Sequence, residues 1–202
     1  MTDLFEEKAE DWDRREVVRA LSEAIGSAMV EQVPFTADMT VMDFGAGTGL
    51  ITAQVAPRVG QVVGVDTSPA MLEKLAAKPA LQGRVKIACQ DILEQPLAQT
   101  FDAIVSAMAM HHVEDTDRLI ETFARHLKPG GWLALADLDT EDGSFHPPDV
   151  EGVYHHGFDR QALSERLERH CFTDVRFVTA HTVQREDGTF PVFLVTARKA
   201  DG

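Results

Sequence analysis

The sequence predicts an α/β fold built around one mostly parallel β-sheet, and two observations lead to this prediction. Short apolar runs, rich in β-branched residues and almost free of charge, recur along the chain at 39–43, 61–65, 84–88, 101–106 and 131–137. Helix-like stretches separate these runs. Consecutive strands are therefore expected to be joined by right-handed crossovers, with helices covering both faces of the sheet.

The helices are predicted from their start and stop signals. A helical segment from about Leu4 to Val33 precedes the first strand. In "SPAMLEKLAA", Ser68 can cap a helix that has Pro69 at its first position. A further helix, "DTDRLIETFARHL", ends before the turn signal "KPGG".

The last part of the chain departs from the strand–helix alternation. A helix-like "RQALSERLERH" that Asp159 can cap is followed by strand-like "TDVRFVTA" and, after a short connection, by "GTFPVFLVTARK". A short connection suits a hairpin, so the last strand is predicted to run antiparallel.

Composition narrows the classes of protein. The 202 residues are 44% hydrophobic, which suits one domain spanning 1–202. The net charge of −14 disfavours a nucleic-acid partner. Two cysteines, Cys89 and Cys171, form neither a disulfide framework nor a metal-binding pair, and no apolar run approaches the roughly 20 residues that span a bilayer. We therefore expect a cytoplasmic protein without a membrane partner.

The stretch "VMDFGAGTGL", residues 41–50, predicts a ligand-binding turn. An apolar strand passes through Asp43 into three glycines, and a helix is expected to begin near Thr48. Glycine permits positive φ and lets a ligand touch the backbone. No lysine follows, as a phosphate loop requires, and the third glycine comes one position too early for the dinucleotide fingerprint. A purely structural turn is the alternative.

Two more acidic residues lie at the ends of neighbouring predicted strands. Asp66 ends "QVVGVD", where a carboxylate can accept both hydroxyls of a ribose. Asp91 follows the next strand and could accept a hydrogen bond from an exocyclic amine, with Ile92 packed against the base. Because the carboxyl ends of parallel strands meet at one edge of a sheet, the pattern predicts a nucleoside site there.

Five segments together resemble a known family. "VMDFGAGTG", "VVGVDTSPAML", "CQDILE", "FDAIVSAMAMHHVED" and "HLKPGGWLALADL" are similar, in order and spacing, to successive motifs of the class I S-adenosylmethionine-dependent methyltransferases. The resemblance covers roughly residues 5–197. It implies a Rossmann-like three-layer sandwich with a seven-stranded sheet of order 3-2-1-4-5-7-6, strand 7 antiparallel. It also implies an N-terminal helical cap at 1–35 and a lid or substrate insertion at 139–160.

The resemblance further implies S-adenosyl-L-methionine as cofactor and S-adenosyl-L-homocysteine as product. The glycines would hold the methionine end, Asp66 the ribose and Asp91 the adenine, while Ser106 would lie beside the sulfonium. Trp12 belongs to "FEEKAEDWDRR", which is similar to a family segment that closes over the cofactor; packing on the sheet is the alternative. The implied cofactor-binding residues are Trp12, Asp43, Gly45, Ala46, Gly47, Thr48, Gly49, Asp66, Thr67, Ser68, Met71, Asp91, Ile92 and Ser106.

A methyl acceptor that is protonated at neutral pH needs a base that takes its proton. Alignment of donor and acceptor and exclusion of water favour the methylation of every acceptor. The candidate catalytic residues are His111, His112, His146 and Tyr154. The lid sequence adds further substrate-facing candidates: Phe145, His155, His156 and Phe158. A metal site is disfavoured, because the lid histidines lack helical i, i+4 spacing and a nearby cysteine. Histidines that hydrogen-bond to the backbone are the structural alternative.

The sequence therefore predicts a methyltransferase that acts on a small-molecule acceptor at oxygen or nitrogen. A non-catalytic module that binds the cofactor or its product is one alternative. An NAD(P)-dependent oxidoreductase is another, which the early third glycine and the absence of a Tyr-x-x-x-Lys pair disfavour. The sequence does not specify the acceptor, the pathway or the oligomeric state, monomer or homodimer.

Overall fold

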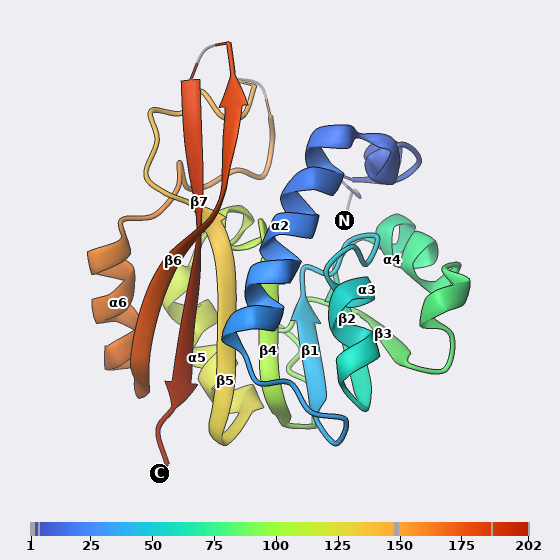
Figure 1. Ribbon diagram of the computed structural model, residues 1–202, viewed down its shortest axis with the longest axis vertical. Coiled ribbons are helices and arrows are strands. Elements are labelled where there is room, and N and C mark those ends of the chain that lie inside the picture. The colour runs from blue at the N-terminus through green and yellow to red at the C-terminus, as the bar shows by residue number, and fades with distance from the viewer. Residues whose placement is uncertain (1–2, 4, 148–149, 187, 202) are drawn as a thin grey trace.

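A computed structural model describes residues 3, 5–147, 150–186 and 188–201. Its seven strands form one sheet of order β3-β2-β1-β4-β5-β7-β6, in which β7 runs antiparallel to both neighbours (Figure 1). The strands are β1 (Thr40–Phe44), β2 (Gln61–Asp66), β3 (Val85–Cys89), β4 (Phe101–Ala107), β5 (Leu127–Leu138), β6 (Phe172–Arg185) and β7 (Gly188–Lys199). The predicted fold class, strand order and antiparallel last strand are confirmed.

The helices and 3₁₀ turns are α1 (Glu6–Ala9), η1 (Trp12–Arg14), α2 (Glu16–Gln32), α3 (Thr52–Val55), η2 (Ala56–Arg58), α4 (Pro69–Ala76), η3 (Pro79–Leu81), η4 (Met110–His112), α5 (Thr116–His126) and α6 (Arg160–Arg169). Two predicted caps are confirmed. The Ser68 hydroxyl accepts the N–H of Met71, and the Asp159 carboxylate accepts the N–H of Ala162. Both helices therefore begin where the sequence predicted.

Two groups of buried side chains form the core. One includes Ile25 of α2, Val55 of α3 and Leu75 of α4, and the other includes Phe123 of α5 and Leu167 of α6. Figure 1 shows α2 in front of the sheet and α5 behind it. The sheet is thus covered on both faces, as strands joined by crossover helices require.

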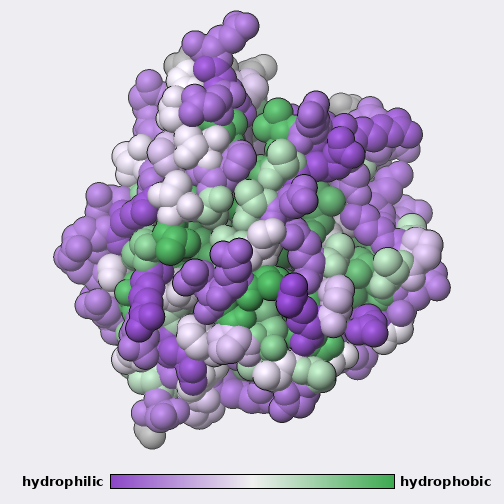
Figure 2. Space-filling view, viewed as in Figure 1, coloured by the Kyte–Doolittle hydropathy of each residue, from purple (hydrophilic) through white to green (hydrophobic). Residues whose placement is uncertain are grey.

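The surface in Figure 2 is mostly hydrophilic, with smaller apolar areas between the charged side chains. Of the large apolar or aromatic side chains that the structure describes, three are exposed: Val17, Ile87 and Tyr154. Within the described part of the chain, every helix falls short of the length and apolar character that crossing a bilayer demands.

Two predicted helices differ in the structure. The segment expected to be helical from about Leu4 is broken at Arg15, whose backbone is extended, and Leu4 itself lies outside the described residues. The helix expected near Thr48 begins only at Thr52. Gly49 has a φ of +82°, which a right-handed helix cannot contain, so the turn lasts until this glycine is passed.

The predicted turn at "KPGG" lies inside β5 as an irregularity. The partners of β4 jump from the pair Phe101–Leu127 to the pair Ala103–Trp132, so β5 carries extra residues at this point. At the other end of the sheet, β6 continues to Arg185, and Gly188 already begins β7. This hairpin extends beyond the rest of the sheet, next to the connection between β5 and α6 (Figure 1).

Candidate functional site

The turn after β1 exposes backbone at one of its three glycines. All three have positive φ: +67° at Gly45, +53° at Gly47 and +82° at Gly49. A Cβ on Gly45 would lie 2.4 Å from that of Ala109, and one on Gly49 would lie 2.8 Å from Cγ of Leu75. A Cβ on Gly47 would meet no heavy atom within 4 Å. Packing therefore explains two of the glycines, whereas Gly47 leaves bare backbone beside open space.

Asp66 fastens this turn to the end of β2. Its Oδ2 accepts the N–H of Gly47 at 2.8 Å, and its Oδ1 accepts the N–H of Ser68 at 2.9 Å. Burial raises the pKa of this carboxyl group. Each carboxylate oxygen has more than one acceptor position, so both can also accept hydroxyl hydrogens.

Two buried polar groups lie beside the turn. Asp43 is 1% exposed, and its Oδ2 accepts the hydroxyl of Thr52 at 2.5 Å. Burial raises its pKa to about 7. On the adjacent strand, Ser106 is paired with Phe44, and its buried hydroxyl has no hydrogen-bond partner among the described residues. A buried polar atom of this kind calls for a ligand.

The N-terminal segment is fastened over the same edge of the sheet. Asp13 accepts the hydroxyl of Thr48 at 2.5 Å and pairs with the ammonium of Lys78 at 2.7 Å. Asp3 accepts the hydroxyl of Ser68 at 2.8 Å. These contacts tie the segment to both the glycine turn and α4, and the hydroxyl of Thr48 is already engaged.

Two aromatic rings extend this cover towards η4. Trp12 lies edge-on to Phe5 at a centroid distance of 6.2 Å. Phe5 in turn lies edge-on to His112 at 5.5 Å. The position of Trp12 agrees with a segment that lies over the strand ends; a contact between Trp12 and a cofactor stays a prediction.

Five other predicted cofactor residues differ in exposure. Thr67 is exposed, whereas Ala46 and Met71 are buried. Asp91 is exposed, and its Oδ1 accepts the N–H of Leu93 at 2.8 Å. Ile92 is 0% exposed and belongs to the core on the α5 side. Its side chain therefore acts first as a core residue, and its predicted contact with a base stays untested.

Three histidines gather at the end of β4. His111 and His112 belong to η4 and His146 to the connection between β5 and α6. Their ring centroids are 4.1 Å apart for His111 and His112, 5.0 Å for His111 and His146, and 6.0 Å for His112 and His146. The structure thus brings together three of the four predicted catalytic residues.

Among the described residues, His111 is the one histidine of this cluster that has a carboxylate partner. Its Nδ1 lies 2.7 Å from Oδ1 of Asp137, and its backbone N–H donates to Oδ2 at 3.1 Å. His111 and Asp137 are 1% and 0% exposed. Nε2 of His111 is buried without a partner among the described residues.

The neighbouring histidines are uncharged at neutral pH. Burial, together with the proximity of His111, lowers the pKa of both His112 and His146 to about 4. Nδ1 of His112 lies 2.7 Å from the carbonyl oxygen of Gly152. Nε2 of His146 is buried and has no described partner.

The second half of the predicted lid is docked on η4. The carbonyl oxygen of His111 accepts the N–H groups of Tyr154 at 3.0 Å and His155 at 3.3 Å. Nε2 of His155 lies 2.9 Å from the carbonyl oxygen of Val113, and His156 lies 3.5 Å from Glu141. The structural alternative, histidines bonded to backbone, therefore describes His155 and, through Gly152, also His112.

Three predicted lid residues, Phe145, Phe158 and Tyr154, differ in exposure. Phe145 and Phe158 are 7% and 8% exposed and join opposite core clusters, because the lid folds back onto the sheet. The side chain of Tyr154 is 54% exposed. Tyr154 contacts the histidine cluster through its backbone N–H, which donates to the carbonyl oxygen of His111.

Sequence reasoning missed several residues that hold the site. Asp137 was detectable as the one acid within the apolar stretch "WLALADL". Glu141 accepts the N–H groups of Gly143 and Phe145. Arg185 donates to the carbonyl oxygen of Phe145, and its guanidinium lies 4.2 Å from that ring. Glu141 holds its own turn through near neighbours, whereas the role of Arg185 depends on a contact across 40 positions and leaves no local pattern.

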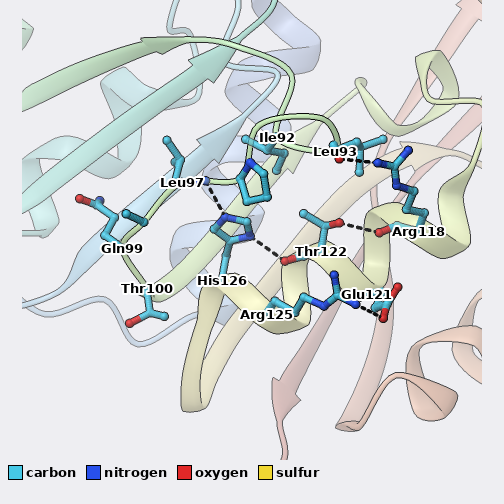
Figure 3. Close-up of a pocket in the computed structure, with 12 residues that line it drawn as sticks. Ile92, Leu93, Leu97, Gln99, Thr100, Arg118, Glu121, Thr122, Arg125 and His126 are labelled. Carbon is cyan, nitrogen blue, oxygen red and sulfur yellow. Dashed lines mark hydrogen bonds and ion pairs between the residues drawn. The ribbon is translucent and has the colours of Figure 1, made fainter.

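A cavity of about 340 Å³ lies elsewhere, between the β3–β4 connection and α5 (Figure 3). Two of its polar side chains are engaged: His126 accepts the N–H of Leu97 and contacts the carbonyl oxygen of Thr122, and Arg118 donates to that of Leu93. No group of three or more His, Cys, Asp or Glu residues in the described ranges could hold a metal ion.

The glycine turn yields a prediction from a matched pair of variants. Gly47→Ala is expected to cost about 1 to 2 kcal/mol of unfolding free energy, the cost of a left-handed non-glycine residue. Gly45→Ala should cost more, because its Cβ also overlaps Ala109. Urea unfolding measures both. Equal losses in the two variants would contradict the packing difference.

Residues 41–131 match a family model described as a methyltransferase domain. An uncharacterised methyltransferase of Geobacillus kaustophilus is 32% identical over 180 residues, covering 85% of this chain and 81% of the relative. One from Schizosaccharomyces pombe is 36% identical over 135 residues, covering 59% of this chain; the match spans only 48% of that relative's length.

Solved structures share the fold. The partner of the Trm112 methyltransferase activator in a Haloferax volcanii complex superimposes with a TM-score of 0.81 at 17% identity, covering 99% of both chains. The N-methyltransferase NodS of Bradyrhizobium japonicum, in complex with S-adenosyl-L-homocysteine, gives a TM-score of 0.73 at 18% identity, covering 98% of this chain and 99% of NodS.

Proposed function

Because this chain belongs to the class I S-adenosylmethionine-dependent methyltransferases, we propose that it methylates a small-molecule acceptor at oxygen or nitrogen. The observation that carries the proposal is the cluster of His111, His112 and His146 at the end of β4. Imidazole groups suit an acceptor that loses a proton as it is methylated. A net charge of −14 favours a small molecule over a nucleic acid.

The residues around the glycine turn fit the cofactor. Bare backbone at Gly47, the carboxylate of Asp66 and the unpartnered hydroxyl of Ser106 lie at the ends of adjacent strands. In this proposal Gly47 borders the methionine end, Asp66 accepts the ribose hydroxyls and Ser106 lies beside the sulfonium. When bound, the sulfonium supplies a methyl carbon whose bond to sulfur breaks, leaving the electron pair on sulfur.

The protein would contribute alignment and exclusion of water. The N-terminal segment closes the site through Asp13 and Thr48, and the lid closes it through Gly152 and Tyr154. Holding donor and acceptor in line can supply about 7 to 11 kcal/mol of barrier reduction. We place the acceptor between these two covers, next to the histidine cluster.

Cofactor binding is tested by calorimetric titration with S-adenosylmethionine and S-adenosylhomocysteine, with NADH as the competing ligand class. We expect the wild-type protein to bind both sulfur nucleosides and not NADH, and Asp66→Ala to lose this binding, because the ribose acceptor is removed. Asp38→Ala, an exposed acid ahead of β1, is the matched control. Binding of NADH alone, or unchanged affinity in Asp66→Ala, would contradict the assignment.

The acceptor is identified by a methyl-transfer screen over phenols, enols, carboxylic acids and amines, read as formation of S-adenosylhomocysteine. Turnover of one class above the background without acceptor would support the proposal. Binding of the cofactor without turnover of any class would favour the non-catalytic alternative.

A further inference from the structure

His111 and Asp137 form a buried pair, and its hydrogen bonds define which ring nitrogen of His111 carries the hydrogen. Asp137 accepts three hydrogen bonds: from Nδ1 of His111 at 2.7 Å, from the backbone N–H of His111 at 3.1 Å and from that of Leu138 at 2.8 Å. A carboxylate only accepts, so Nδ1 carries the hydrogen of this pair. In the neutral imidazole, Nε2 therefore has a free lone pair.

The free nitrogen is not used by the fold. Nε2 of His111 is buried without a described partner, although buried polar atoms are nearly always hydrogen-bonded. The ring lies 4.1 Å from that of His112 and 5.0 Å from that of His146, centroid to centroid. The unsatisfied nitrogen thus lies within the cluster, at the carboxyl end of the sheet, where the proposed acceptor binds.

We propose that Nε2 of His111 is the base that takes the acceptor's proton, and that Asp137 is a positioning residue that holds His111 in the required tautomer. This inference rests on the proposed function. A lone pair on the acceptor's oxygen or nitrogen forms the bond to the methyl carbon as the bond from that carbon to sulfur breaks. The acceptor's O–H or N–H bond releases its proton. The proton passes to Nε2, and the resulting imidazolium is stabilised by the carboxylate of Asp137.

His112 and His146 are less suited than His111 to hold the acceptor's proton. Nδ1 of His112 is engaged by the carbonyl oxygen of Gly152, which favours a hydrogen on that nitrogen. Among the described residues, neither His112 nor His146 has a carboxylate within hydrogen-bond distance, and the low pKa of both, about 4, agrees with this arrangement. The described charged or titratable groups that act on the cluster are Asp137 of β5, His112 of η4, His146 of the lid, Lys8 of α1 and Arg185 of β6.

The assignment is tested by imidazole ¹⁵N NMR on the protein with S-adenosylhomocysteine, which requires no acceptor. We expect the hydrogen of neutral His111 on Nδ1. In Asp137→Asn the preference for Nδ1 should be lost. Asp139→Asn, at the same strand end but paired with Arg160, should leave the tautomer unchanged.

One result from the wild-type protein would overturn the inference: a neutral His111 with its hydrogen on Nε2. Failure of S-adenosylhomocysteine to bind in calorimetry would instead contradict the proposed function, so the two failures are distinguishable.

Discussion

Replacing His111 with asparagine is expected to lower kcat by about 100- to 10,000-fold on an acceptor found in the screen, the usual contribution of a general base. Asparagine keeps a donor at the position of Nδ1, so Asp137 retains a partner, while Nε2 is removed. Affinity for S-adenosylhomocysteine should stay within a few-fold of the wild type, because the glycine turn and Asp66 are untouched.

The control is His170→Asn at the end of α6, where the histidine pairs with Asp117 outside the histidine cluster. It should leave kcat near the wild-type value. A His111→Asn protein that folds, binds S-adenosylhomocysteine and keeps wild-type turnover would show that the acceptor needs no base from His111. An acceptor that is already ionised should be much less sensitive to the change than a protonated one.

The contribution of Asp43 to the free energy of unfolding is expected to fall as pH rises from about 4 to about 7. Burial raises its pKa in the folded protein from 3.8 to about 7. Between these values the folded state holds a proton that the unfolded chain has released, so each step up in pH favours unfolding. At about 1.4 kcal/mol per pH unit, the loss attributable to Asp43 is about 4 kcal/mol and is complete above about pH 7.

Urea unfolding of wild type and Asp43→Asn across this pH range measures the effect. The variant carries no titrating group at this position, so the difference between the two proteins should change steadily up to about pH 7 and then level off. Asp38→Asn removes an exposed acid with a lowered pKa and should leave the slope above about pH 4 unchanged. Parallel curves for wild type and Asp43→Asn would contradict a buried, protonated Asp43.

Much of the fold is encoded locally and could be predicted. The apolar runs marked the strands, the short connection before Gly188 predicted the hairpin, and Ser68 and Asp159 marked helix starts. The strand order came from the resemblance of the motifs to a known family. The late start of α3 was missed, because a helical pattern does not reveal that Gly49 has a positive φ.

The sequence by itself determined the order of the elements and the edge of the sheet where the site lies, because hydrophobic period, caps and turn residues act between near neighbours. Tertiary structure alone decided which side chains meet there. Asp137 reaches His111 across 26 positions, and Asp13 reaches Thr48 across 35. It also buried Phe145 and left Tyr154 exposed. Such pairings depend on how loops fold back onto the sheet, which no local pattern records.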